Sequence, residues 1–187
     1  DNTALMALND LAAAQAAAKQ STKDSLDQLL DYLATHPNAK IRYYESPMIL
    51  QTHSDASYLS APKARSRAAG FFFLSNNPAQ PIQSELNGTI HVLCKIIKSV
   101  VGSAAESEIA AACLNSHEAI PMRNTLEELG HKQPATPMQV DNTTAVGFMH
   151  KQIKQRRSKA IDMRFYWLQD RQQQQQFSVC WKEGINN

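Results

Sequence analysis

The order of apolar runs after residue 46 is the feature that most constrains the fold of this chain. Three strand-like segments follow one another with short connections, at residues 47–55, 67–74 and 89–94. Helical patterns then alternate with two further short apolar runs, at residues 138–141 and 177–181. Short connections favour antiparallel pairing, and strand–helix–strand units favour parallel pairing with right-handed crossovers. The sequence therefore predicts an α/β fold: a mixed five-stranded sheet of three antiparallel strands, then two parallel strands, flanked by helices.

Two helical segments precede these strands. Residues 3–19 are rich in alanine, and a second segment carries leucines at three- and four-residue spacing before it ends near His36. This pattern predicts a helical hairpin. We also expect a short strand at residues 40–44, where polar and apolar residues alternate.

Proline is expected to divide the longest helical pattern that follows the third strand. Pro121 lies between an Ala-rich piece at residues 104–119 and a second piece at 122–129, and a proline within a helix removes a backbone hydrogen bond. Two further helices are expected, at residues 142–150 and 160–173.

Composition sets broad limits on the class of protein. The 187 residues are 43% hydrophobic with a formal net charge of +2, which supports one ordinary domain with a small appendage. We place the boundary between residues 1–46 and 47–187. Three widely separated cysteines indicate reduced, buried thiols in an intracellular protein. No apolar run is long enough for a membrane span, and the start without Met indicates a segment of a longer chain.

Three acidic residues are candidates for one site. Asp55 and Asp141 each end an expected strand, and ligand sites of open α/β sheets form beyond the carboxyl ends of strands. The helix that connects those strands begins with Glu106 and Glu108. Glu106 is in line with Ile109 on the expected sheet-facing stripe, so we expect Glu106 to point inward and Glu108 to lie on the surface.

A cluster of carboxylates needs a cation. Several carboxylates close together cannot all be charged without one, and Mg²⁺ prefers such oxygen ligands. Two such ions can activate a water and stabilise the leaving oxygen during hydrolysis of a phosphodiester. The spacing of the acids alone leaves a second interpretation open, in which they are ordinary surface residues.

Five strings of the sequence resemble a known family. SDASYLSAPKARSRAAGFFFL, SAAESEIAAACLNSHEAI, RNTLEELG, VDNTTAVG and RSKAIDMRFYWLQDR together resemble the ribonuclease H domain of copia-type retrotransposon polyproteins. LLDYLATHPNAKIRYYES resembles the end of the preceding reverse transcriptase region. Residues 1–46 would then be the helical end of that region, and residues 47–187 a ribonuclease H-like domain.

The resemblance implies an activity, a cofactor and partners. The reaction would be hydrolysis of the RNA strand of RNA–DNA hybrids with Mg²⁺ or Mn²⁺. The family's catalytic metal ligands match Asp55, Glu106 and Asp141. The partners would be the hybrid and the remainder of the reverse transcriptase. The paired-Asp motif of a polymerase active site is absent from the sequence, so we expect no polymerase activity.

One ligand of the family is expected to be missing. The family's last catalytic Asp lies in an Asn-Leu-Ala-Asp-like stretch just after the final strand, and this sequence ends at Gly184-Ile185-Asn186-Asn187. The alternative function is therefore a catalytically inactive ribonuclease H-like module that binds nucleic acid or acts as a scaffold.

Basic, aromatic and polar residues supply further candidates. Ser54 and Asn142 are expected to support the acids through hydrogen bonds, or else to serve in turns and caps. Four late aromatic residues are expected mainly in the core, with stacking on bases as the alternative. They are Phe165, Tyr166, Trp167 and Trp181. A run of basic residues is either a solvated loop or a contact for hybrid phosphates. It comprises Lys151, Lys154, Arg156, Arg157 and Lys159.

Overall fold

The computed structural model of the chain describes residues 2–76, 86–150 and 159–182. These residues divide between two compact units, Asp1–Arg42 and Tyr43–Asn187. The boundary between the units lies a few residues before the predicted one. Each unit is described by itself.

The first unit is a helical hairpin. Its expected first helix is broken into shorter pieces, because η1 and η2 have 3₁₀ geometry on either side of α1. The second helix begins where the Lys19 backbone N–H donates to Thr22 Oγ1 over 3.1 Å. The elements are η1 (Asn2–Ala4), α1 (Leu5–Ala14), η2 (Gln15–Ala17) and α2 (Gln20–Thr35).

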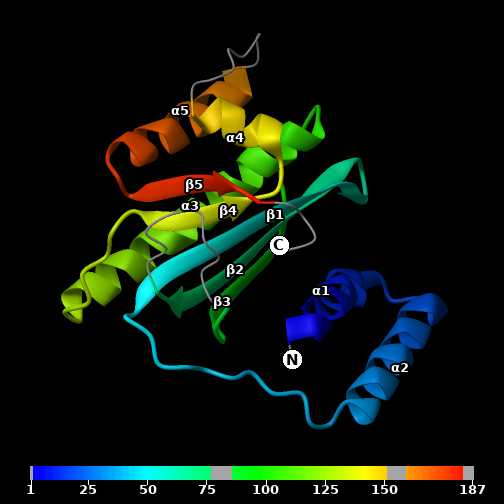
Figure 1. Ribbon diagram of the computed structural model, residues 1–187. Helices are drawn as coiled ribbons and strands as arrows, with labels where there is room; N and C mark the ends of the chain where they lie inside the picture. Colours follow the sequence, from blue (N-terminus) through cyan, green and yellow to red (C-terminus); the bar gives the residue numbers. More distant parts are fainter. Residues whose placement is uncertain (1, 77–85, 151–158, 183–187) are drawn as a thin grey trace. The chain divides into compact units, whose positions relative to one another are not determined.

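The second unit contains a mixed five-stranded sheet, as predicted (Figure 1). Its order is β3-β2-β1-β4-β5, with β1 antiparallel to β2, β2 antiparallel to β3, and β4 parallel to both β1 and β5. The first strand is central, and β4 lies beside it. The strands are β1 (Ile49–Ala61), β2 (Arg65–Ser75), β3 (Thr89–Ile96), β4 (Thr136–Val140) and β5 (Phe177–Trp181).

Three helices accompany the sheet. Figure 1 shows α3 (Ala104–Glu128) running across it, with α4 (Thr143–Met149) and α5 (Lys159–Gln173) near β4 and β5. The helix α3 packs on β1 and β2 and also contacts α5. Residues of β1 alternate between the two sheet faces, so Leu50 and Ser54 face α3 while Asp55 belongs to the other face. The core between sheet and helices includes Leu50, Phe72, Leu93, Ile109, Ala112, Met138 and Val179.

The predicted strand at residues 40–44 is wrong. This segment is irregular, and Tyr43 and Tyr44 are 62% and 63% exposed. The Asn87 side chain hydrogen-bonds both backbone polar groups of Tyr44. Its Oδ1 accepts from Tyr44 N over 2.8 Å, and its Nδ2 donates to Tyr44 O over 2.9 Å. Those groups are therefore not paired with a neighbouring strand.

The predicted break at Pro121 is also wrong, because α3 continues through it. Proline removes the N–H that would bond to the carbonyl of His117, four residues earlier. Both Pro121 and His117 are exposed, so water can satisfy that carbonyl and the break costs less than it would in the core.

The cysteines are free thiols. Cys113 is buried and Cys94 is half-buried, but Cys180 is exposed, so the expectation of three buried thiols is wrong for Cys180. Among the described helices, none has the length and apolar character needed to cross a membrane.

Candidate metal centre

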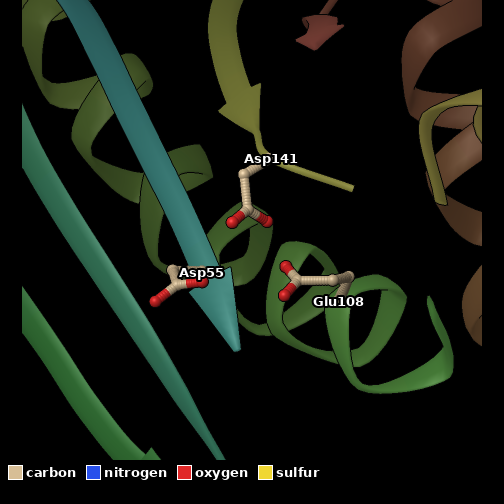
Figure 2. Close-up of side chains that lie close together, drawn as sticks. All are labelled: Asp55, Glu108 and Asp141. Atoms are coloured by element: carbon tan, nitrogen blue, oxygen red, sulfur yellow. The ribbon is translucent and has the colours of Figure 1, made fainter. Parts of the chain in front are cut away.

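Three carboxylates from three separate elements converge at one end of the sheet (Figure 2). Asp55 lies in β1, Asp141 directly follows β4, and Glu108 lies in the second turn of α3. One carboxylate oxygen from each of the three lies within 4.8 Å of the others. The three side chains point toward one another in Figure 2. The spacing suits oxygen atoms that share a cation.

Strand pairing brings the two aspartates together. The parallel pairing of β1 with β4 ends at Ser54 and Val140, so the next residues, Asp55 and Asp141, lie side by side just beyond it. Asp55 does not end its strand, as the sequence analysis expected, because β1 continues to Ala61 in a hairpin with β2. The end of the parallel pairing, rather than the end of the strand, is what marks the site.

The assignment of the two glutamates is wrong. Glu108, expected on the surface, is 5% exposed, and its Oε1 accepts from Ala56 N over 3.1 Å. Glu106 instead closes the start of α3: its Oε2 accepts from Gly102 N over 2.6 Å, and its N–H donates to Ser103 Oγ over 3.1 Å. Capping with a nearby acid is the usual arrangement at a helix N-terminus.

The helix face explains the error. The alanines of α3 lie on several sides of the helix, so the spacing of apolar residues does not identify the side that packs on the sheet. The buried stripe runs through Glu108, Ala112, Asn115 and Ala119, which are each at most 5% exposed. A polar asparagine seven residues after a glutamate was the signal available in the sequence, because both would then lie on one helix face.

Electrostatics at Glu108 are those of a buried acid among other acids. Burial, followed by the charges of Asp55 and Asp141, raises the pKa of Glu108 to about 8, against a smaller lowering by the Ala56 hydrogen bond. Burial also raises the pKa of Asp55. Glu108 Oε2 is buried without a hydrogen-bond partner among the described residues. Such an oxygen, aimed into a group of carboxylates, fits a cation or a proton.

Without metal, the stability of the protein is expected to fall as pH rises from about 6.5 to 8. An unfolded Glu titrates near 4.5 and folded Glu108 at about 8, so in this window the folded state holds one more proton than the unfolded state. Linkage then lowers the free energy of unfolding by about 1–2 kcal/mol across the window. Urea unfolding in EDTA at both pH values measures this change in the free energy of unfolding. A free energy of unfolding that stays constant or rises between the two pH values contradicts the prediction.

The titration of His53 sets the lower limit of this pH window, at about 6.5. Burial, together with a smaller contribution from the charge of Lys182, lowers the pKa of His53 to about 4. An unfolded His titrates near 6.5, so His53 makes stability rise with pH between about 4 and 6.5. Its contribution is complete above that range, where the Glu108 contribution has the opposite sign.

Asn115 connects the back of this site to two strands. Its Nδ2 donates to Ser54 Oγ and to Ala69 O, each over 2.8 Å. Ser54 precedes Asp55, and Ala69 pairs with Asp55 across β1 and β2. Ser54 is thus tied to α3 next to Asp55, and its role in supporting the acids stays a prediction.

The remaining candidates have different positions. Asn142 Oδ1 accepts from Ala145 N over 3.0 Å, so Asn142 caps α4. Trp181, expected in the core, is 49% exposed. Lys159 begins α5, but its side chain is outside the described part of the structure. Outside the described residues altogether are Lys151, Lys154, Arg156 and Arg157.

Solved structures with the same arrangement of strands and helices are ribonucleases H. The structure of LC11-RNase H1 in complex with an RNA/DNA hybrid gives a TM-score of 0.54 at 10% identity, covering 74% of this chain and 88% of that one. The N-terminal RNase H domain of Rv2228c from Mycobacterium tuberculosis gives 0.51 at 10% identity, covering 75% and 86%. The second unit therefore has a ribonuclease H fold.

The sequence is similar to a retrotransposon polyprotein. It is 25% identical over 147 residues to the retrovirus-related Pol polyprotein from transposon TNT 1-94 of Nicotiana tabacum. The match covers 79% of this chain but only 10% of that polyprotein, so the chain spans about a tenth of its relative. No family model matches the chain. The match confirms the resemblance to a retrotransposon polyprotein.

Proposed function

We propose that this chain is a metal-dependent ribonuclease H-type endonuclease that hydrolyses the RNA strand of RNA–DNA hybrids. The observation that carries the proposal is the buried, unpartnered Oε2 of Glu108 inside a group of three carboxylates, at one end of a ribonuclease H fold. A solved structure of the same fold holds an RNA/DNA hybrid, which supports the class of substrate.

Asp55, Glu108 and Asp141 would hold the metal. Their oxygens are hard ligands within 4.8 Å of one another, which suits Mg²⁺ or Mn²⁺. The Ala56 N–H, bonded to Glu108 Oε1, keeps that carboxylate turned toward β1. When bound, the metal would polarise the phosphate and generate hydroxide from water near neutral pH. Glu108 must lose its proton to bind the metal, so binding is expected to strengthen as pH rises toward 8.

The direct test is cleavage of a labelled hybrid in Mg²⁺ by the parent chain and by Asp55→Asn. Asn retains the shape of the side chain but removes its charge, so the rate is expected to fall by about 10²-fold or more. Asp170→Asn is the matched control, because Asp170 is an exposed acid on α5 beside Arg171, and its rate should equal that of the parent.

The outcomes also discriminate the inactive alternative. Equal cleavage by the parent and Asp55→Asn would contradict a role for Asp55. Hybrid binding by the parent without cleavage in Mg²⁺ or Mn²⁺ would instead support a non-catalytic nucleic-acid-binding module. Membership of a reverse transcriptase polyprotein, with residues 1–46 from its preceding region and an intracellular location, is part of the same proposal.

A further inference from the structure

Trp181 is placed beside the candidate metal centre. It is the last residue of β5 and pairs with Val140, the residue before Asp141. Its indole Nε1 donates to the backbone oxygen of Asp141 over 2.9 Å. The hydrogen bond fixes one edge of the ring against the chain that carries an acid of the cluster.

Trp181 nevertheless remains partly exposed to solvent. The residue is 49% exposed, so part of a large apolar surface is left unburied. Among the aromatic residues that the structure describes, none stacks on Trp181. Trp167 differs, because it stacks on His117 at 4.2 Å between ring centroids and has the Arg171 guanidinium over its face.

A positive charge lies next to Trp181. Lys182 continues the chain, and its backbone N–H donates to Val140 O over 3.1 Å. Val140 is the residue before Asp141 and pairs with Trp181, so a cationic residue and an anchored aromatic ring lie together beside one acid of the cluster. This combination suits a nucleic acid backbone with its adjoining sugars and bases.

We propose that Trp181 is a substrate-contacting residue, whose exposed face packs on the sugar and base edge of a nucleotide next to the phosphate at the acidic cluster. The proposal rests on the proposed function, since it takes the same substrate. A hybrid duplex keeps its bases stacked, and its shallow minor groove displays sugars and base edges. A ring fixed by its N–H loses little conformational freedom when such a surface covers it.

The two tryptophans allow a matched fluorescence experiment. Trp167→Phe leaves Trp181 as the single tryptophan, and Trp181→Phe leaves Trp167. Each variant is titrated with a short RNA–DNA hybrid in Ca²⁺ instead of Mg²⁺ to limit turnover, and binding is followed independently by anisotropy of a dye on the DNA. At saturation, acrylamide quenching of Trp181 is expected to fall about twofold or more, because the hybrid covers the exposed half of the ring. Quenching of Trp167 should not change.

Affinity supplies the second measurement. Trp181→Ala is expected to weaken hybrid binding about tenfold, because the large ring surface that packs on the sugar and base edge is lost. Thermal unfolding establishes that this variant is folded. If a substitution of Trp167 unfolds the chain, 5-fluorotryptophan in the unsubstituted protein gives two fluorine resonances, of which that of Trp181 should shift with hybrid.

Each outcome bears on the inference. Hybrid binding with unchanged quenching and unchanged fluorine resonance of Trp181 overturns it and leaves the proposed function standing. Absence of hybrid binding overturns both. Protection of Trp181 together with weaker binding by Trp181→Ala supports the contact, even if no cleavage is detected in Mg²⁺.

Discussion

Glu108→Gln is expected to stabilise the metal-free protein and to abolish its cleavage of a hybrid. Gln retains the oxygen that accepts from Ala56 N and replaces the buried, unpartnered oxygen with an NH₂ group that can donate to Asp55 or Asp141. Near pH 8 in EDTA the free energy of unfolding should therefore rise, on the order of 1–3 kcal/mol. The same change removes a charged ligand, so cleavage in Mg²⁺ should fall by about 10²-fold or more.

Glu106→Gln is the control for this prediction. Glu106 lies two residues away on the same helix, where it accepts from Gly102 N outside the acidic cluster. The Glu106→Gln variant should lose about 1 kcal/mol or less of stability, because its side chain interacts more weakly with the helix N-terminus. It should keep the cleavage rate of the parent. Urea unfolding in EDTA and in Mg²⁺, with hybrid cleavage, measures both variants. Loss of activity in Glu106→Gln with normal activity in Glu108→Gln would restore the sequence-based assignment.

Gly70→Ala is expected to destabilise the protein by roughly 2–4 kcal/mol. A Cβ at Gly70 would overlap Asn115 Oδ1 and lie 2.8 Å from Asn115 Cγ. Asn115 is fully buried and held by Ser54 and Ala69, so its amide cannot turn away without losing both hydrogen bonds. The lost stability should appear as a lower urea midpoint with an unchanged m-value.

A double-mutant cycle tests the stated cause. Asn115→Ala removes the atoms that Gly70→Ala would meet, so the double variant should be more stable than the sum of the two single effects predicts, by about 1 kcal/mol or more. Additive effects would mean that the overlap at Asn115 is not the source of the loss. The double variant should also bind Mg²⁺ more weakly than the parent, because Asn115 no longer ties α3 to the strands beside Asp55.

The sequence was sufficient for the order of the five sheet strands along the chain and for the antiparallel and parallel directions of their pairing. Short connections gave three antiparallel strands, and the segments 138–141 and 177–181 became β4 and β5 because helices separate them and return the chain in parallel. Asp55 and Asp141 could also be predicted from the sequence as members of the candidate site. The residues that directly follow the parallel pairing of two neighbouring strands lie side by side, as Asp55 and Asp141 do after Ser54 and Val140.

The third acid depended on the tertiary structure. Glu106 and Glu108 both begin the same alanine-rich helix, and a helix with small residues on every side can dock in several rotations. Long-range contacts decide the rotation of α3. Ala56 N donates to Glu108 Oε1, and Asn115 donates to Ala69 O where Gly70 leaves room for its side chain. Because these contacts join residues about 45 or more positions apart, local spacing did not contain them. The sequence by itself therefore determined the fold and two aspartates of the candidate site, and the packing of α3 decided which glutamate joins them.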